Sequence, residues 1–182
     1  MTNDSVGRLG EAALNYAKRG WPVFPLHHPV DGTCSCGKPD CESPAKHPRG
    51  DLVPHGLNEA TTDLTTITKW WEQVPDANIG LRTGQISGIV VVDVDAKNGG
   101  IEFWRDLQDL NGRVDTLTSV TGGGGQHLFF KAPAEELKST TGKMAPGIDT
   151  RAEGAYVVMP PSLHISGRRY YWEGNDDSAD MD

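Results

Sequence analysis

The sequence predicts an α/β (α+β) fold in which helices flank a sheet that carries the functional residues. Three observations predict it. A β-branched strand ends in two aspartates, amphipathic helices alternate with strands, and a long cysteine-containing loop requires a cross-link or a metal ion to hold it together. A chain of 182 residues is long enough to bury a core, either as one domain or as one compact domain of two lobes. We expect this domain to span residues 1–173, with a zinc-binding loop inserted at residues 27–54.

The strand expected at residues 89–95 is the central feature of the predicted fold. Its first four residues are β-branched, which is typical of the interior of a buried strand. Asp93 and Asp95 follow at positions i and i+2, so their side chains are expected on the same face. Two like charges side by side repel each other unless a cation lies between them. Alone, the pattern would fit a strand that ends in an acidic turn equally well.

Periodicity places the remaining elements around this strand. Apolar spacing predicts helices at residues 7–19, 64–73 and 100–111, and Asp63 is expected to help cap the second. We expect Trp70 and Trp71 to pack in the core and not to stack on bases. Residues 135–144 are expected to form a surface loop or a short helix. Further strands are expected at residues 21–26, 78–83, 117–121, 128–130, 147–151, 154–162 and 168–172, with 78–83 beside 86–95. In the third helix the side chains expected to face the sheet are Phe103, Trp104, Leu107 and Leu110.

The negative charge of the chain argues against nucleic acid as a binding partner but does not exclude it. The formal net charge is −8 at pH 7, but residues 173–182 hold five acidic side chains and no basic one, so removing them leaves −3. We expect residues 174–182 to be an acidic, unstructured tail or the start of a linker. No apolar run approaches the roughly 20 residues of a bilayer-spanning helix, and the N-terminus shows no signal segment, so a cytoplasmic protein without a membrane partner is expected.

The three cysteines of the chain cluster in the loop at residues 27–54. An odd, clustered set in a cytosolic chain favours metal binding over disulfides. The spacing predicts a tetrahedral site for structural zinc, formed by Cys34, Cys36, Cys41 and His47. His28 and Asp40 are lesser candidates for the fourth ligand. The alternative is a set of incidental thiols beside a solvated histidine.

A glycine-rich turn and a later strand complete the candidate site. The run Gly122–Gly125 precedes His127 and could turn main-chain N–H groups towards an anion, although it is neither a P-loop nor a dinucleotide fingerprint. A flexible hairpin tip is the alternative. Asp149 and Arg151 alternate along a strand and are expected on one face. Lys46 could face a phosphate, although a solvated surface cation is the commoner meaning.

Taken together, these motifs resemble the archaeo-eukaryotic primase superfamily. More narrowly, residues 9–173 resemble the bifunctional primase/polymerase (prim-pol) domain at the N-terminus of phage and plasmid replication proteins. The motifs that carry the resemblance are NIGLRTG at 78–84, VVVDVD at 90–95, GGGQH at 123–127, IDTR at 148–151 and PPS at 160–162. The chain departs from the superfamily at the second motif, where Gly125 stands in place of the serine of Ser-x-His.

The resemblance implies a primase-like fold with a central mixed or antiparallel sheet and a two-metal nucleotidyl transfer. Asp93, Asp95 and Asp149 would bind Mg²⁺ or Mn²⁺, which oxygen ligands suit. The expected partners are single-stranded DNA template, NTP or dNTP, and a helicase domain C-terminal in the full-length protein, in a bacterial or phage-infected cell. The residues expected to bind the nucleotide are His127, Arg151, Gly123, Gly124, Gly125 and Lys46.

Two other functions fit parts of the pattern. Three carboxylates with two ions would also serve a nuclease or phosphohydrolase. A catalytically silent, zinc-stabilised DNA-binding module of a replication helicase would use the cysteines but not the aspartates. Arg151 and the glycine turn favour a triphosphate over the first, and the scarcity of basic residues disfavours the second.

Overall fold

The computed structural model describes residues 6–174, apart from the side chains of residues 142–144. The chain forms two compact units, Met1–Arg82 with Tyr156–Tyr170 and Thr83–Ala155 with Tyr171–Asp182. Apart from Gly174, the acidic tail expected at residues 174–182 lies outside the described residues. None of the described helices is both long and apolar enough to cross a membrane.

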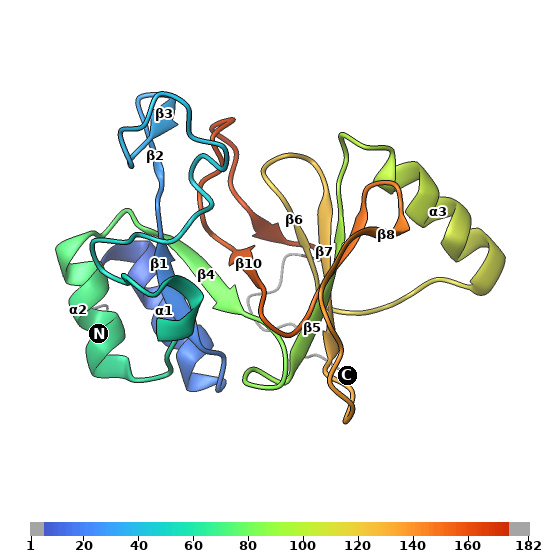
Figure 1. The fold of residues 1–182 in the computed structure, drawn as a ribbon, viewed down its shortest axis with the longest axis horizontal. Helices are drawn as coiled ribbons and strands as arrows, with labels where there is room; N and C mark the ends of the chain where they lie inside the picture. The colour runs from blue at the N-terminus through green and yellow to red at the C-terminus, as the bar shows by residue number, and fades with distance from the viewer. Residues whose placement is uncertain (1–5, 175–182) are drawn as a thin grey trace. The chain divides into compact units, whose positions relative to one another are not determined.

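The first unit is built on a three-stranded antiparallel sheet in the order β1-β4-β10 (Figure 1). Two helices lie side by side and pack against it. The sheet strands are almost wholly buried, and at Gly80 of β4 a Cβ would lie 2.8 Å from the Phe24 ring. The elements are α1 (Gly7–Lys18), β1 (Val23–Leu26), α2 (Leu64–Gln73), β4 (Asn78–Arg82) and β10 (Tyr156–Met159).

An N-terminal cap and two buried tryptophans stabilise helix α2. The Asp63 side chain accepts a hydrogen bond of 2.8 Å from the Thr66 N–H, which satisfies one of the helix's unpaired donors. Trp70 and Trp71 are buried, and the Trp71 indole N–H donates to the Ala77 carbonyl at 3.0 Å. Both tryptophans therefore belong to the core, as the apolar spacing predicts.

The cysteine-containing loop has little regular structure. It holds a two-stranded hairpin, β2 (Pro29–Val30) with β3 (Thr33–Cys34), and a 3₁₀ turn, η1 (Gly56–Glu59), follows it. The loop returns to the edge of β1, where the His27 N–H donates to the His47 carbonyl at 2.9 Å. Both ends of the loop are thereby brought together beside the sheet.

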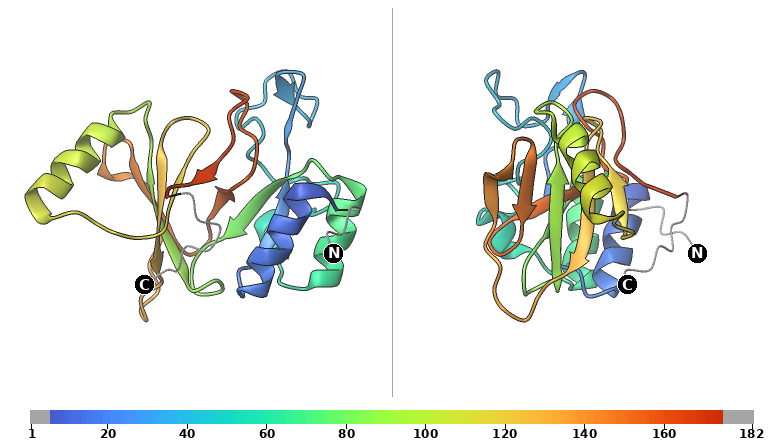
Figure 2. Two further views of the ribbon diagram at one scale, coloured as in Figure 1. Left: turned by 180° about the vertical axis from the view of Figure 1, so that it is seen from behind. Right: turned by 90° about the vertical axis from the view of Figure 1, so that its right-hand side faces the viewer.

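The second unit is a six-stranded antiparallel sheet in the order β11-β6-β7-β5-β9-β8, with α3 on one face (Figure 2). Trp104 of α3 packs in a core with Val94, Leu128, Ala145 and Ile148, all from that face. The elements are β5 (Ile89–Val94), α3 (Gly100–Asn111), β6 (Thr118–Val120), β7 (Gln126–Lys131), β8 (Thr140–Ala145), β9 (Ile148–Arg151) and β11 (Tyr171–Trp172).

The structure confirms the fold class and corrects three details. The strands expected to be neighbours, β4 and β5, lie in different sheets, because β4 pairs with β1 and β10 whereas β5 pairs with β7 and β9. Residues 140–145 form strand β8 instead of a loop or helix.

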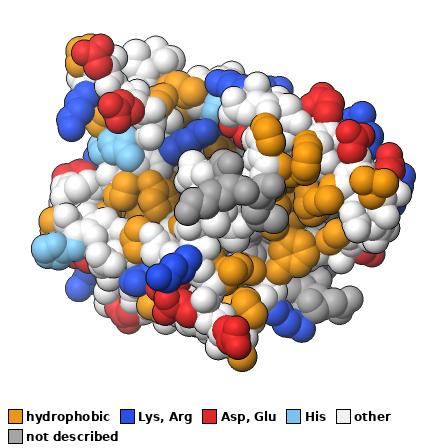
Figure 3. Space-filling model, turned by 45° about the vertical axis from the view of Figure 1, so that its right-hand side comes forward, with side chains coloured by type: hydrophobic (Ala, Val, Ile, Leu, Met, Phe, Trp, Pro, Cys, Tyr) orange, Lys and Arg blue, Asp and Glu red, His pale blue; other side chains and the backbone are white. Residues whose placement is uncertain are grey.

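The third correction concerns the apolar face of α3. Phe103 and Leu110 are 41% and 84% exposed, so only Trp104 and Leu107 of the four expected side chains pack towards the sheet. Apolar patches accordingly lie among acidic and basic side chains on the surface (Figure 3).

Candidate functional site

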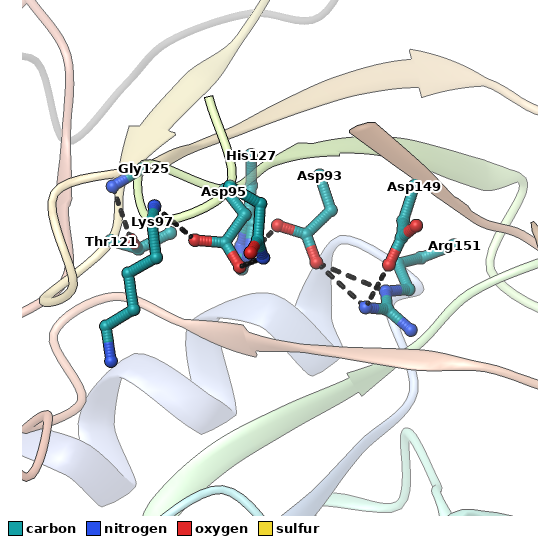
Figure 4. Close-up of polar contacts among 9 residues, drawn as sticks. Asp93, Asp95, Lys97, Thr121, Gly125, His127, Asp149 and Arg151 are labelled. Carbon is teal, nitrogen blue, oxygen red and sulfur yellow. Dashed lines mark hydrogen bonds and ion pairs between the residues drawn. The ribbon is translucent and has the colours of Figure 1, made fainter. Parts of the chain in front are cut away.

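The candidate site is a row of side chains that crosses adjacent strands of the second unit. Asp93 on β5 lies directly opposite His127 on β7 and opposite Asp149 on β9. Because directly paired residues project to the same side of a sheet, these side chains share one face, and Arg151, two residues after Asp149, joins them (Figure 4). This face is opposite the one that α3 covers.

Arg151 holds the two opposed carboxylates together. Its Nη2 lies 3.0 Å from Asp93 Oδ2 and 3.1 Å from Asp149 Oδ2, and its Nε donates to Asp93 Oδ2 at 3.2 Å. His127 Nε2 lies 3.6 Å from the other Asp93 oxygen. The side chains of Asp93 and Asp149 are only 23% and 20% exposed, so their repulsion is screened less than it would be in open solvent.

Asp95 lies just beyond the end of β5 and is exposed. Its Oδ1 accepts a hydrogen bond of 2.8 Å from the Lys97 N–H, and its Oδ2 accepts one of 3.0 Å from the Asn98 side-chain amide. Both carboxylate oxygens are therefore held by donors from the loop that leads into α3 (Figure 4).

The glycine-rich turn is stabilised mainly by Thr121. The Gly124 N–H donates to the Thr121 carbonyl at 2.9 Å, and the Gly125 N–H donates to the Thr121 hydroxyl at 3.0 Å. Two of the main-chain donors expected to face a phosphate are thus used inside the turn. Gly125 has a further reason to be glycine, since a Cβ there would lie 2.3 Å from the Val94 carbonyl oxygen.

The donor set of this face fits a hard divalent cation. Arg151 is shared by two carboxylates, those of Asp93 and Asp149, so negative charge is in excess on this face, and carboxylate oxygens are the ligands that Mg²⁺ and Mn²⁺ prefer. The three carboxylates are not gathered around one point: among residues 6–174, the only group of three or more His, Cys, Asp or Glu side chains that is placed to hold a metal ion lies elsewhere.

That other set is the predicted zinc site in the first unit. The ligand atoms of Cys34, Cys36, Cys41 and His47 all lie within 4.8 Å of one another, and Cys34 Sγ is 3.5 Å from His47 Nε2. Ligands around one zinc ion are separated by about 3.3–3.8 Å. The Cys3His cluster could therefore bind zinc with four protein ligands.

The surroundings of the cluster act in opposite directions on the thiols of Cys36 and Cys41. The Lys38 N–H donates to Cys36 and lowers the pKa of that thiol to about 6, whereas partial burial raises the pKa of Cys41. The Ala45 N–H donates to Cys34 Sγ at 3.3 Å. The ring of His27 packs 4.4 Å from that of His47. Cys36 is therefore a ready ligand at neutral pH, and metal binding would favour deprotonation of Cys41.

The lesser candidates for the fourth ligand are not in the cluster. His28 instead lines a pocket of the first unit with Leu9, Asp76 and Arg169, among other residues. Burial lowers the pKa of its imidazole. His47 therefore completes the set.

A comparison of the whole chain with protein families agrees with this geometry. Residues 13–181 match the family model of Prim-Pol, described as bifunctional DNA primase/polymerase, N-terminal. The chain belongs to this family. Its function is accordingly, in general terms, of the DNA primase/polymerase type, and nucleotidyl transfer is the activity at the level of the family. No curated protein matches the chain.

The structure brings together most, but not all, of the residues predicted for the Prim-Pol site. Lys46 belongs to the first unit, where its carbonyl accepts a hydrogen bond of 3.0 Å from the Tyr156 hydroxyl, and its contact with nucleotide stays a prediction. Sequence reasoning missed Ser119, which is buried on β6 directly opposite His127. It also missed Asn98, because a side chain in a polar loop gives no periodic signal.

The zinc site yields a test that uses the small number of cysteines. Since all three cysteines lie in the cluster, the purified Prim-Pol chain is expected to hold one zinc ion and to show almost no thiol reactivity until a strong chelator is added. Chelation should then expose three reactive thiols and lower the thermal unfolding midpoint by about 5 °C or more. Elemental analysis, a colorimetric thiol assay and calorimetry measure these outcomes.

Substitutions separate ligands from neighbours in the same loop. Cys41→Ser should lose zinc, whereas Asp40→Asn should keep it, because the Asp40 side chain is exposed and lies outside the cluster. Full zinc content in Cys41→Ser would contradict the assignment.

The ion pairs of Arg151 yield a second prediction. Arg151→Gln leaves Asp93 and Asp149 opposed without a counter-charge, so the free energy of unfolding should fall by about 1–2 kcal/mol at low salt and by less at high salt. Urea denaturation of the purified variant measures this difference.

The double variant Arg151→Gln/Asp149→Asn should regain part of the loss, because it removes the repulsion. Arg105→Gln, on the exposed surface of α3, serves as the control and should unfold like the unaltered chain. If Arg151→Gln and the control have the same free energy of unfolding, the ion pairs of Arg151 with Asp93 and Asp149 contribute nothing to stability.

Proposed function

We propose that this chain is a DNA-dependent primase/polymerase that transfers nucleotides to a primer or a first nucleotide on a single-stranded DNA template by a two-metal mechanism. The observation that supports it most strongly is the single row formed by His127, Asp93 and Asp149 across three adjacent strands, with Arg151 bridging the two carboxylates. Membership of the Prim-Pol family supports the same conclusion independently.

The carboxylates supply the cation site in this proposal. Asp93, Asp95 and Asp149 would hold Mg²⁺ or Mn²⁺. Such ions, when bound, lower the pKa of the attacking 3′-hydroxyl and neutralise charge on the leaving pyrophosphate. The row itself supplies orientation, because residues fixed on paired strands are positioned more rigidly than residues on loops.

His127 and Arg151 would bind the triphosphate. His127 is buried at the start of β7, so its ring direction is restricted, and its Nε2 is directed towards Asp93. Arg151 contacts the carboxylates through Nε and Nη2, while its Nη1 points away from both (Figure 4). A guanidinium has five N–H donors, so Arg151 can contact a phosphate oxygen through Nη1 and still hold the aspartates.

The template and further partners follow from this activity. A polymerase that accepts any sequence binds its template mainly through the backbone, so affinity should fall steeply as salt rises. A helicase domain C-terminal in the full-length protein, and a phage or plasmid replication setting, complete the proposal. The zinc would be structural, since four protein ligands leave no open coordination position.

The test is nucleotide incorporation on defined templates. The zinc-loaded chain is incubated with single-stranded DNA, labelled NTP and dNTP, and Mn²⁺ or Mg²⁺, with and without an annealed primer. We expect products that depend on the aspartates: Asp93→Ala and Asp149→Asn should each lower the rate roughly a hundred-fold or more, because each removes a cation ligand. Asp109→Asn, exposed on α3, is the matched control.

The other outcomes point to different functions. Shortened template would indicate a nuclease. Template binding without synthesis under any condition, unchanged in Asp93→Ala, would indicate a silent DNA-binding module. Synthesis only with an annealed primer would keep the polymerase and place initiation outside this chain.

A further inference from the structure

Asp95 differs from the other candidate carboxylates in its surroundings. Strand β5 ends at Val94 and α3 begins at Gly100, so Asp95 lies in the connecting loop, where its side chain is exposed. An exposed aspartate ordinarily samples several rotamers, and ordering it for a ligand costs conformational entropy. If Asp95 binds a cation at a fixed place, other groups must restrict it.

Two donors restrict the carboxylate. The Lys97 main-chain nitrogen lies 2.8 Å from Oδ1 (Figure 4). The Asn98 side-chain Nδ2 lies 3.0 Å from Oδ2. Hydrogen bonds to a charged acceptor are about twice as strong as neutral ones. Each carboxylate oxygen keeps a further lone pair, so both hydrogen bonds are compatible with binding of a cation.

The backbone of Asp95 is fixed as closely as its side chain. The Asp95 N–H donates to the Gly147 carbonyl at 2.7 Å, and the Asp95 carbonyl accepts from the Gly100 N–H at 3.0 Å. A Cβ on Gly100 would lie 2.3 Å from the Gly147 carbonyl oxygen, so only glycine allows this approach. Gly147 immediately precedes β9, so these contacts tie Asp95 to the strand that carries Asp149.

The Asn98 side chain does not cap helix α3, which follows it. The residue at the N-cap of α3 is Gly99, which has no side chain with which to cap the helix. A helix N-terminus offers N–H donors and needs acceptors, whereas Asn98 uses its amide nitrogen, a donor, on Asp95. The interaction is therefore directed at the carboxylate.

We propose that Asn98 is a positioning residue for the cation site: its side-chain amide orients the Asp95 carboxylate, together with the Lys97 N–H, so that Asp95 acts with Asp93. This inference rests on the proposed function, because it assumes that Asp95 is a cation ligand. Asn98 contributes through a side chain, so substitution can remove its hydrogen bond while the main-chain donor stays.

The test measures cation binding directly as well as activity. Mn²⁺ is titrated into the zinc-loaded chain without nucleotide, and free Mn²⁺ is followed by electron paramagnetic resonance. Asn98→Ala should weaken Mn²⁺ binding about ten-fold, the lower end of the effects seen when a group that orients a metal ligand is removed. Because the side chains of Asn98 and Asp95 are both exposed, Asn98→Ala should have the same thermal unfolding midpoint as the unaltered chain.

A matched control exists in the same unit. Asn111→Ala also removes a hydrogen bond of an exposed asparagine amide, in this case to the neutral Leu107 carbonyl at 2.9 Å, at the far end of α3. It should leave Mn²⁺ binding unchanged. In primer extension, a high Mn²⁺ concentration should restore the rate of Asn98→Ala, which keeps its ligand, but not that of Asp95→Ala, which has lost it.

The outcomes separate this inference from the proposed function. Mn²⁺ binding and synthesis in the unaltered chain, with Asn98→Ala indistinguishable from Asn111→Ala, would overturn the role of Asn98 alone. A chain whose Mn²⁺ binding is unaffected by both Asp93→Ala and Asp95→Ala would overturn the cation site and, with it, this inference.

Discussion

The charged face of the sheet in the second unit depends on the contact of Arg151 with Asp93 and Asp149. Antiparallel pairing of β5 with β9 sets the two carboxylates directly opposite each other, a placement that is unfavourable without a cation. Arg151, from the same strand as Asp149, bridges both at 3.0 and 3.1 Å. Charged side chains can therefore lie at this end of one face, which buries Val91 and Phe129 further along, while the other face packs Val94, Leu128 and Ile148 beneath α3.

The two units contain metal-binding chemistry of opposite kinds. The Cys3His cluster offers soft ligands whose atoms surround one point, in a loop that few apolar contacts could hold otherwise. The aspartate face offers hard oxygen ligands spread along neighbouring strands and one loop. The Cys3His arrangement suits a structural zinc ion that would hold the loop in one conformation. The second is the arrangement that the proposed nucleotidyl transfer would use, because its cations would also bind substrate oxygens.

Sequence reasoning failed where the outcome depends on which segments meet. The spacing of α3 is amphipathic, yet Leu110 is exposed, because the sheet extends under only part of the helix. The glycine run fits both an anion-facing turn and a hairpin tip; in the structure Gly124 and Gly125 donate to Thr121, and Gly125 also has to avoid the Val94 carbonyl. A one-dimensional pattern cannot distinguish glycine needed for a ligand from glycine needed for a neighbouring strand.

The sequence alone determined most of the elements, the Cys3His set and the identity of the candidate aspartates, because these follow from local periodicity and from ligand spacing within one loop. The tertiary structure decided the strand partners, and with them the row that aligns His127, Asp93 and Asp149. It also decided that Ser119 lies opposite His127 and that Asn98 contacts Asp95. Register and loop contacts depend on segments distant in sequence or without periodicity, so only the folded chain specifies them.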